Sequence, residues 1–319
     1  MKRRPAIPAV RPRFIARSEP MRALLGQIRR FAATDSNILI TGETGTGKNA
    51  IARELHAHGP RAKLPFVTID CASLPASLID SELFGHERGA FTDAVSARAG
   101  RFELAEGGTV YLDAVTELPI EAQGKLLRIV EEKRVERLGG HTSFAMTARI
   151  VSSADARIED AVRYGSFRGD LYHRLRVLPI VVPPLRERLD DLLPLATYFT
   201  ARAAATVGRP APALSHDAAA ALRDYAWPGN VRELRHVVER ACGVAGAEIT
   251  LAHLPPEILE APALSPDRTL AGRPTLDEVE RRYIAATLRH ARGNQTKAAQ
   301  LLGISRKALW EKRKRYGLE

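Results

Sequence analysis

The chain has 319 residues, which is enough for about two domains at roughly 100–200 residues each. It carries 48 Lys and Arg against 37 Asp and Glu, and the net charge of +11 favours a polyanionic partner such as DNA. The most apolar stretch, residues 177–185, is interrupted by Pro179, Pro183 and Pro184, so no run approaches the roughly 18 residues that span a membrane.

The cysteines and the start of the chain point to the same compartment. Cys71 and Cys242 lie far apart in sequence and form no metal-ligand spacing. No signal peptide is visible, because Pro8, Arg11 and Pro12 interrupt any apolar stretch near Met1. We therefore expect a cytoplasmic protein with reduced thiols and no membrane partner.

Short β-rich runs alternate with helical stretches over the first half of the chain. The runs are residues 37–40, 66–69, 109–112 and 149–151. Alternation of this kind predicts a parallel α/β sheet. We expect an N-terminal tail over residues 1–20, followed by an α/β subdomain over residues 21–184.

Helical patterns replace the β-rich runs after Pro183 and Pro184. They cover residues 216–225 and 230–243 and predict a small helical lid over residues 185–258. Residues 259–274 are rich in proline and are typical of a semi-rigid linker. A separate all-helical module is expected over residues 275–319, and its first helix has apolar residues at Leu276, Val279, Tyr283 and Leu288.

A glycine-rich segment lies between the first β-rich run and the helical stretch at residues 50–57. This order of strand, glycine-rich loop and helix is typical of the Walker A phosphate-binding loop, or P-loop. Backbone N–H groups and the helix N-terminus bind the β- and γ-phosphates there, and Lys48 adds a full positive charge. We predict that ATP is held by Gly42, Glu43, Thr44, Gly45, Thr46, Gly47, Lys48 and Asn49. Asn49 stands where such loops usually have the Ser or Thr that coordinates Mg²⁺, so direct ligation by Asn49 stays open.

The third β-rich run ends in Asp113, a position from which a carboxylate holds Mg²⁺ through water. In hydrolysing members of this broad class a Glu follows and polarises the attacking water, but here the residue is Ala114. Loss of a group that orients water lowers turnover far more than nucleotide affinity. We therefore expect tight ATP binding with poor hydrolysis, and we do not assign the missing role to Glu117, which lies past the strand end.

Residues 293–310 predict a helix-turn-helix. Ala299 permits close helix approach, Gly303 can take the left-handed turn, and Ser305 can cap the second helix. Leu302, Ile304 and Leu309 stand where the two helices should pack. The second helix is strongly basic, which suits a recognition helix in a major groove, although a solvated basic helix is the alternative. The DNA-binding candidates are Ser305, Arg306, Lys307, Lys312 and Arg313, with the first three expected to reach base edges.

Several motifs, in the same order along the chain, resemble the sigma-54-dependent transcriptional activators, which are bacterial enhancer-binding proteins of the AAA+ class. The most specific is residues 85–94, which are similar to the loop that touches sigma-54 in that family. The other matching segments are residues 102–105, 167–175, 183–188 and 227–234. The resemblance covers nearly the whole chain and implies an α/β AAA+ P-loop parallel sheet with a helical lid, plus a small all-α Fis-type helix-turn-helix domain.

The resemblance also implies roles for individual residues. The sigma-54 contact would be made by Gly89, Ala90, Phe91, Thr92, Asp93 and Ala94. Arg168 and Arg174 would be arginine fingers that reach the γ-phosphate held by a neighbouring subunit, and Arg232 would be the sensor arginine of the lid. The implied partners are the sigma-54 RNA polymerase holoenzyme, DNA, and further copies of the chain, as a hexamer through the AAA+ domain and a dimer through the helix that begins near Thr275.

The chain departs from the family pattern at four positions. Asp93 replaces the second glycine of the loop motif and adds a negative charge at a contact surface. Asp70 and Asp155 stand where the family has Asn, which places carboxylates near a phosphate. Ala114 is the fourth, and it reflects either a natural loss of turnover or an engineered change, the second being slightly favoured by the otherwise family-like segment 112–118.

The predicted function is a sigma-54-dependent activator that uses ATP to remodel the polymerase holoenzyme toward the open complex, with impaired hydrolysis. No receiver or sensing domain precedes Met21, so control is expected from a regulatory protein in trans, from expression level, or from a region that has been removed. The alternative is a DNA-binding regulator that uses ATP only as a structural ligand, independently of sigma-54, and Asp93 and Ala114 favour it. An unrelated AAA+ helicase or unfoldase is disfavoured by the Phe91 loop together with the helix-turn-helix.

Overall fold

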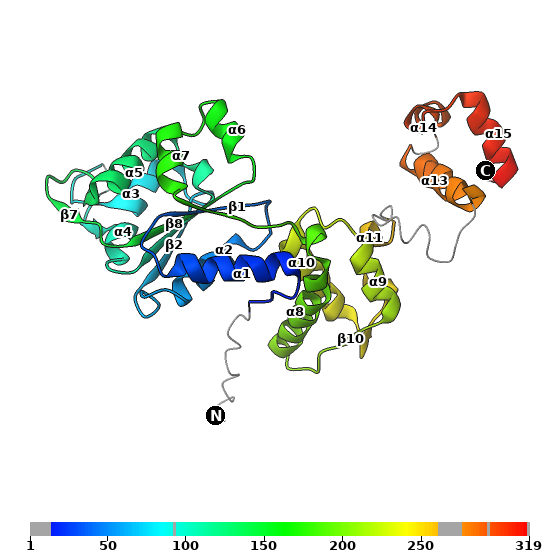
Figure 1. Cartoon of the computed structure of the whole chain (residues 1–319), viewed down its shortest axis with the longest axis horizontal. Helices are drawn as coiled ribbons and strands as arrows, with labels where there is room; N and C mark the ends of the chain where they lie inside the picture. The colour runs from blue at the N-terminus through cyan, green and yellow to red at the C-terminus, as the bar shows by residue number, and fades with distance from the viewer. Residues whose placement is uncertain (1–13, 92–93, 261–275, 292–293, 318–319) are drawn as a thin grey trace. The chain divides into compact units, whose positions relative to one another are not determined.

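The computed structural model describes residues 14–91, 94–260, 276–291 and 294–317. They form two compact units. The first unit contains the described residues up to 213 together with residues 227–247, and the second contains residues 214–226 and the described residues from 248 onward. Figure 1 shows their elements. Of the predicted segments, residues 1–13 of the tail, the linker after residue 260, and Thr92 and Asp93 lie outside the described residues.

The first unit is built around a five-stranded parallel sheet with the order β2-β5-β8-β1-β9. The strands are β1 (Ile38–Thr41), β2 (Phe66–Asp70), β5 (Thr109–Asp113), β8 (Arg149–Ala154) and β9 (Leu178–Val181). The first four confirm the predicted β-rich runs. The sequence did not predict β9 because Pro179 interrupts its apolar run, but β9 pairs only with β1 at the sheet edge, where a missing N–H is tolerated.

Alternate residues of the strands face two helical layers. Ile38 and Ile40 pack with α1 (Glu19–Ala32) and α2 (Lys48–Ala57) on one face of the sheet. Leu39 and Leu112 pack on the other face, where the buried residues come from α3 (Ala76–Phe84), α5 (Ile120–Glu132) and α7 (Gly169–Leu175). The result is the predicted α/β fold with both faces of the sheet covered.

Four further helices and four short strands complete the first unit as described. They are α4 (Arg101–Leu104), α6 (Ile158–Arg163), α8 (Leu192–Thr206), α10 (Asn230–Val244), and the strands β3 (Gly85–His86), β4 (Arg98–Ala99), β6 (Arg134–Glu136) and β7 (Ser143–Ala145). Two further strands, β10 (Ala213–Leu214) and β11 (Glu248–Ile249), lie after Pro184, where the sequence predicted helices alone. Each has two residues, which is too short to carry a period-two signal.

The second unit is helical and contains α9 (His216–Asp224), α11 (Pro256–Glu260), α13 (Leu276–His290), α14 (Gln295–Leu301) and α15 (Arg306–Tyr316). Helices α13 to α15 share a small core of Ile284, Ala298, Ala299 and Leu309, against which Leu302 and Ile304 pack. Gly303 has a φ of 67°, and the hydroxyl of Ser305 accepts a hydrogen bond from Ala308 N at 3.1 Å. The predicted turn, helix cap and helix contact are therefore confirmed.

None of the helices within the described ranges has the length and hydropathy that crossing a bilayer requires.

Candidate functional site

The P-loop joins the end of β1 to the start of α2. Gly45 and Gly47 have φ values of 81° and 100°, in the left-handed region that favours glycine. A Cβ on Gly45 would lie 2.2 Å from the carbonyl oxygen of Gly229, so this position also has no room for a side chain. The two glycines turn the loop directly into α2, so the helix N-terminus adjoins the loop.

The ammonium group of Lys48 lies against the inside of this loop. Its Nζ donates hydrogen bonds to the carbonyl oxygens of Gly42, at 2.7 Å, and Glu43, at 3.1 Å. Burial lowers the pKa of Lys48, while the charges of Asp155 and Asp113 act in the opposite direction. A partly desolvated ammonium beside backbone N–H groups has the chemistry of a phosphate site.

Asp113, at the end of β5, is linked to Asn49 through a tyrosine hydroxyl. The hydroxyl of Tyr111 lies 2.6 Å from Asn49 Oδ1 and 2.9 Å from Asp113 Oδ1, and it can donate its one proton to either oxygen. Ser153 Oγ donates to the same Asp113 oxygen at 2.5 Å. Burial raises the pKa of Tyr111, so the phenol remains a donor at neutral pH. Hard oxygen donors at the end of β5 fit Mg²⁺, with Asp113 as the carboxylate.

Ala114 follows Asp113 in the left-handed conformation, with φ 55° and ψ 53°. Its N–H donates to Ser153 Oγ at 3.0 Å, and its side chain ends at a methyl group that can accept no hydrogen bond. The turn η1 (Val115–Glu117) follows and places Glu117 beside Ala114. Ala114 and Glu117 both line two clefts, of about 580 and 600 Å³, and Lys48 also lines each of them. The site therefore has no carboxylate at position 114, although Glu117 borders the same clefts.

Helix α10 packs against the P-loop. The N–H of Arg232 donates to Gly45 O at 3.2 Å, and Arg232 lines the same cleft as Lys48 and Asp113. Asn230, which is fully buried, donates from Nδ2 to the carbonyl oxygen of Thr44 at 3.1 Å. The sequence motif at residues 227–234 gave no signal that Asn230 would fix the loop in this way.

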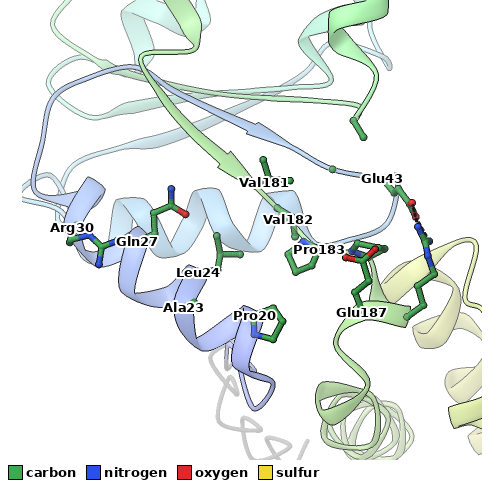
Figure 2. Close-up of a pocket in the computed structure, with 14 residues that line it drawn as sticks. Pro20, Ala23, Leu24, Gln27, Arg30, Glu43, Val181, Val182, Pro183 and Glu187 are labelled. Atoms are coloured by element: carbon green, nitrogen blue, oxygen red, sulfur yellow. Dashed lines mark hydrogen bonds and ion pairs between the residues drawn. The ribbon is translucent and has the colours of Figure 1, made fainter.

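An ion pair connects the P-loop to the turn η2 (Leu185–Glu187). Arg186 donates from both terminal nitrogens to the two carboxylate oxygens of Glu43, at 2.9 and 2.6 Å. Hydrogen bonds from Arg186 and Asn230 hold the pKa of Glu43 at about 2, well below its ordinary value. Glu43 also borders a cleft of about 640 Å³ that is lined by Leu24 and other residues of α1 and by Val181 and Val182 around the end of β9 (Figure 2).

Arg188 is a buried contact that sequence reasoning missed. Only 4% of the residue is exposed, and Nη2 donates to the carbonyl oxygen of Thr46 at 2.6 Å. Three residues further on, Asp191 accepts hydrogen bonds from Ser18 N, at 2.9 Å, and Ser18 Oγ, at 2.7 Å. Burial lowers the pKa of Arg188 to about 10. The residues after Pro184 thus hold both the P-loop and the start of α1.

The other predicted residues of the nucleotide site divide into two groups. Asp70 lines the cleft that contains Asp113, and Asp155 lines the second cleft with Lys48. Arg168 and Arg174 lie instead on the surface around α7, where they pair with Asp170, at 2.8 Å, and Glu131, at 2.9 Å. Neither arginine lines the clefts beside the P-loop of its own chain in the part that the structure describes.

The predicted sigma-54 contact loop extends from the β3–β4 hairpin. Gly89 N donates to Ala94 O at 2.9 Å, which closes the loop. Phe91 is 39% exposed and its ring meets the ring of His86, whereas Ala94 is only 5% exposed. Within the described part of the loop, Phe91 is therefore the side chain that can reach a partner.

The predicted DNA-binding residues are distributed over two faces of α15. Arg306 and Lys307 are exposed in its first turn, next to the capping Ser305. Lys312 instead forms an ion pair with Glu280 of α13, and Arg315 pairs with Asp277 at 2.9 Å. Arg313 is half-buried and also has an interaction within the protein. Of the residues predicted to bind DNA, the cations most available to a polyanion are therefore Arg306 and Lys307, at the start of the helix.

Comparison with known proteins gives the family. The family profile "Sigma-54 interaction domain" matches residues 14–181, "AAA+ ATPase lid domain" matches residues 186–270, and "Bacterial regulatory protein, Fis family" matches residues 275–316. These three matches follow the chain in the predicted order of sheet, lid and helix-turn-helix.

Curated relatives and solved structures agree with these matches. The chain is 45% identical over 302 residues to the alginate biosynthesis transcriptional regulatory protein AlgB of Pseudomonas syringae pv. tomato, covering 94% of this chain and 66% of AlgB. It is 39% identical over 313 residues to the regulatory protein AtoC of Escherichia coli, covering 96% of this chain and 68% of AtoC. The crystal structure of NtrX from Brucella abortus in complex with ATP superposes with a TM-score of 0.74 at 35% identity, covering 96% of this chain and 70% of NtrX.

The chain therefore spans about two thirds of the length of these relatives. The P-loop, the Phe91 loop and the helix-turn-helix lie within the shared part, and the protein belongs to the sigma-54-dependent transcriptional activators, with an AAA+ domain, its lid and a Fis-type DNA-binding domain.

Proposed function

We propose that the chain binds ATP in the cleft between the P-loop and α10 and hydrolyses it only slowly. The observation that carries the second part is the methyl side chain of Ala114, next to Asp113 and facing the same cleft as Lys48. The backbone N–H groups of residues 44–49, the ammonium of Lys48 and the guanidinium of Arg232 bind the phosphates. A site that binds phosphates but cannot orient water loses turnover while it keeps affinity.

Asp113 is the residue that would hold Mg²⁺ with the nucleotide. The cation neutralises charge on the β- and γ-phosphates when it is bound. Tyr111 and Ser153 position the Asp113 carboxylate through the hydrogen bonds described above. Asn49 Oδ1 lies 2.6 Å from the Tyr111 hydroxyl, which supports a structural role for Asn49 in place of metal ligation.

Arg168 and Arg174 act on the γ-phosphate of a neighbouring subunit in a hexameric ring. Their exposed positions around α7, outside the clefts of their own chain, support this arrangement. The Phe91 loop contacts sigma-54, the helix-turn-helix binds upstream DNA as a dimer, and the ring remodels the polymerase holoenzyme.

Ala114 also favours a second function. If Ala114 prevents turnover entirely, ATP serves only as a structural ligand for assembly, and the chain regulates transcription without sigma-54.

The deciding experiment compares the wild-type chain with Ala114→Glu, using Lys48→Ala as the matched control that binds no nucleotide. We expect equal ATP affinity for wild type and Ala114→Glu by equilibrium binding. Phosphate release should rise by about two orders of magnitude or more in Ala114→Glu, the range that a positioned general base contributes.

Open-complex formation with the sigma-54 holoenzyme is measured on the same proteins. Open complexes with Ala114→Glu support the activator, whereas fast turnover without open complexes supports the second function. Turnover by the wild-type chain at the rate of Ala114→Glu contradicts the hydrolysis proposal.

A further inference from the structure

Trp310 is a tryptophan that the protein leaves exposed on the helix-turn-helix. The chain has two tryptophans, and Trp227 is fully buried whereas Trp310 is 56% exposed. An indole usually contributes most when it is covered, because it removes a large apolar area from water. The position of Trp310 on α15 indicates which kind of partner covers this indole.

One face of α15 is used for internal packing. Leu309 is 1% exposed, the ammonium of Lys312 pairs with Glu280, and the hydroxyl of Tyr316 donates to Glu280 at 2.5 Å. These residues recur at spacings of three and four, so they share one side of the helix. That side is occupied by α13 and is closed to an external ligand.

Trp310 lies on a different face, together with basic residues. At about 3.6 residues per turn, Arg306, Trp310 and Lys314 follow each other along one stripe, with Lys307 beside it. All four residues are exposed. The ammonium of Lys314 lies 5.5 Å from the centre of the indole ring, close enough for a cation–π interaction that orients the ring.

The chemistry of this stripe matches a DNA major groove. The three cations suit phosphates and the polar edges of bases, whereas the indole between them has a single N–H donor and is otherwise a large apolar ring. The apolar group that the major groove presents is the C5-methyl of thymine. A second copy of the same stripe is a poor partner, because its cations would face like charges.

We propose that Trp310 contacts the C5-methyl of a thymine in the major groove and sets a preference for an A·T pair at one position of each half-site. The proposal rests on α15 being the helix that contacts DNA. Arg306, Lys307 and Lys314 position the helix, and Trp310 reads the methyl group.

The test replaces thymine by uracil, which lacks only this methyl. The probe is a duplex selected by the full-length chain from a randomised pool, resynthesised with dU at each dT in turn. One replacement should weaken wild-type binding by about fourfold, the value of one buried methyl or methylene group. Trp310→Ala should bind the thymine duplex about tenfold more weakly, within the range of one base contact, and should not distinguish dU from dT at that position.

Three matched variants separate the methyl contact from other effects. Trp310→Phe should keep most of the discrimination, because it keeps an apolar ring. Lys314→Gln should lower the slope of log affinity against log salt by about one, whereas Trp310→Ala should leave that slope unchanged. Val207→Ala removes an exposed apolar side chain at the end of α8, outside the helix-turn-helix and the clefts beside the P-loop, and should leave DNA binding unchanged.

Fluorescence gives an independent readout without mutation. Iodide reaches Trp310 but not the buried Trp227, so DNA should remove the quenchable fraction. A Trp310 that is already protected in the free chain is covered by another part of the protein or by a second copy, and overturns the proposal. If wild type and Trp310→Ala bind equally well, the proposal for Trp310 is overturned, but the DNA-contacting role of α15 stands. If the double variant Arg306→Ala with Lys307→Ala keeps both its affinity and its site preference, the role of α15 and the proposal for Trp310 are both overturned.

Discussion

Glu43 and Arg186 form a bidentate ion pair, with nitrogen–oxygen distances of 2.9 and 2.6 Å. This ion pair joins the P-loop to the turn after Pro184. Asn230 donates to the same carboxylate at 3.1 Å. Glu43 thus connects the loop, the turn η2 and the helix α10 through one ionised side chain. The arrangement predicts how the stability of the first unit depends on pH.

Glu43→Gln should lower the free energy of unfolding at neutral pH and remove part of its acid sensitivity. The folded-state pKa of about 2 lies below the ordinary value of 4.5. Stabilisation by the ionised carboxylate is therefore complete above 4.5 and is lost as the pH falls toward 2. Urea unfolding at a series of pH values should show wild type and variant converging in acid, and the exposed Glu132→Gln serves as the control. A constant difference between wild type and Glu43→Gln across the range contradicts the prediction.

The P-loop glycines should differ in their tolerance of alanine. Gly45, Gly47 and the remote Gly165 all have positive φ, so each alanine costs about 1–2 kcal/mol in backbone strain. At Gly47 and Gly165 a new Cβ meets nothing within 4 Å, but at Gly45 it lies 2.2 Å from Gly229 O. Gly45→Ala should therefore lower the free energy of unfolding further than the other two, and it should weaken ATP binding by displacing Arg232. Equal unfolding free energies for Gly45→Ala and Gly165→Ala would show that the close approach of Gly229 to the loop does not exclude a side chain at position 45.

Ala114→Gly should stabilise the protein. Ala114 has φ 55°, where an alanine is strained by about 1 kcal/mol or more and a glycine is not. Ala114→Glu keeps a Cβ at the same φ, so its stability should stay close to that of wild type. Lys133, also at φ 55°, provides the control for the same relief outside the site, as Lys133→Gly. Thermal unfolding midpoints that fall in Ala114→Gly would contradict this reading of the backbone.

The sequence predicted the parts of the structure that depend on local pattern. The P-loop was recognisable because Gly45, Gly47 and Lys48 follow a β-rich run at fixed spacing, and the helix-turn-helix because Gly303 and Ser305 have backbone roles that few residues can fill. Asp113 was expected at the strand end for the same reason. In these cases neighbouring residues decide the outcome, so a single sequence carries the signal.

Contacts between distant segments could not be predicted in this way. Arg188 donates to Thr46 O across 142 positions, and the Tyr111 hydroxyl lies 2.6 Å from Asn49 Oδ1 across 62. In sequence, Arg188 is one of several surface-like arginines and Tyr111 is an ordinary apolar strand residue. Only the fold brings their polar atoms to buried partners, where hydrogen bonding is required.

Lys312 and Lys307 should differ in their contribution to DNA binding, although both were predicted from sequence as DNA contacts. The ammonium of Lys312 pairs with Glu280, and the hydrogen bonds from Lys312 and Tyr316 lower the pKa of Glu280, which keeps it ionised. Lys307 is exposed in the first turn of α15. Because each phosphate contact contributes about 0.9 to the slope of log affinity against log salt, Lys307→Gln should lower the slope by about that amount. Lys312→Gln should leave the slope almost unchanged and instead lower the unfolding temperature of the helix-turn-helix, and Glu280→Gln should reproduce that loss of stability. A salt slope that falls equally in both lysine variants would mean that Lys312 leaves Glu280 for a phosphate when DNA binds.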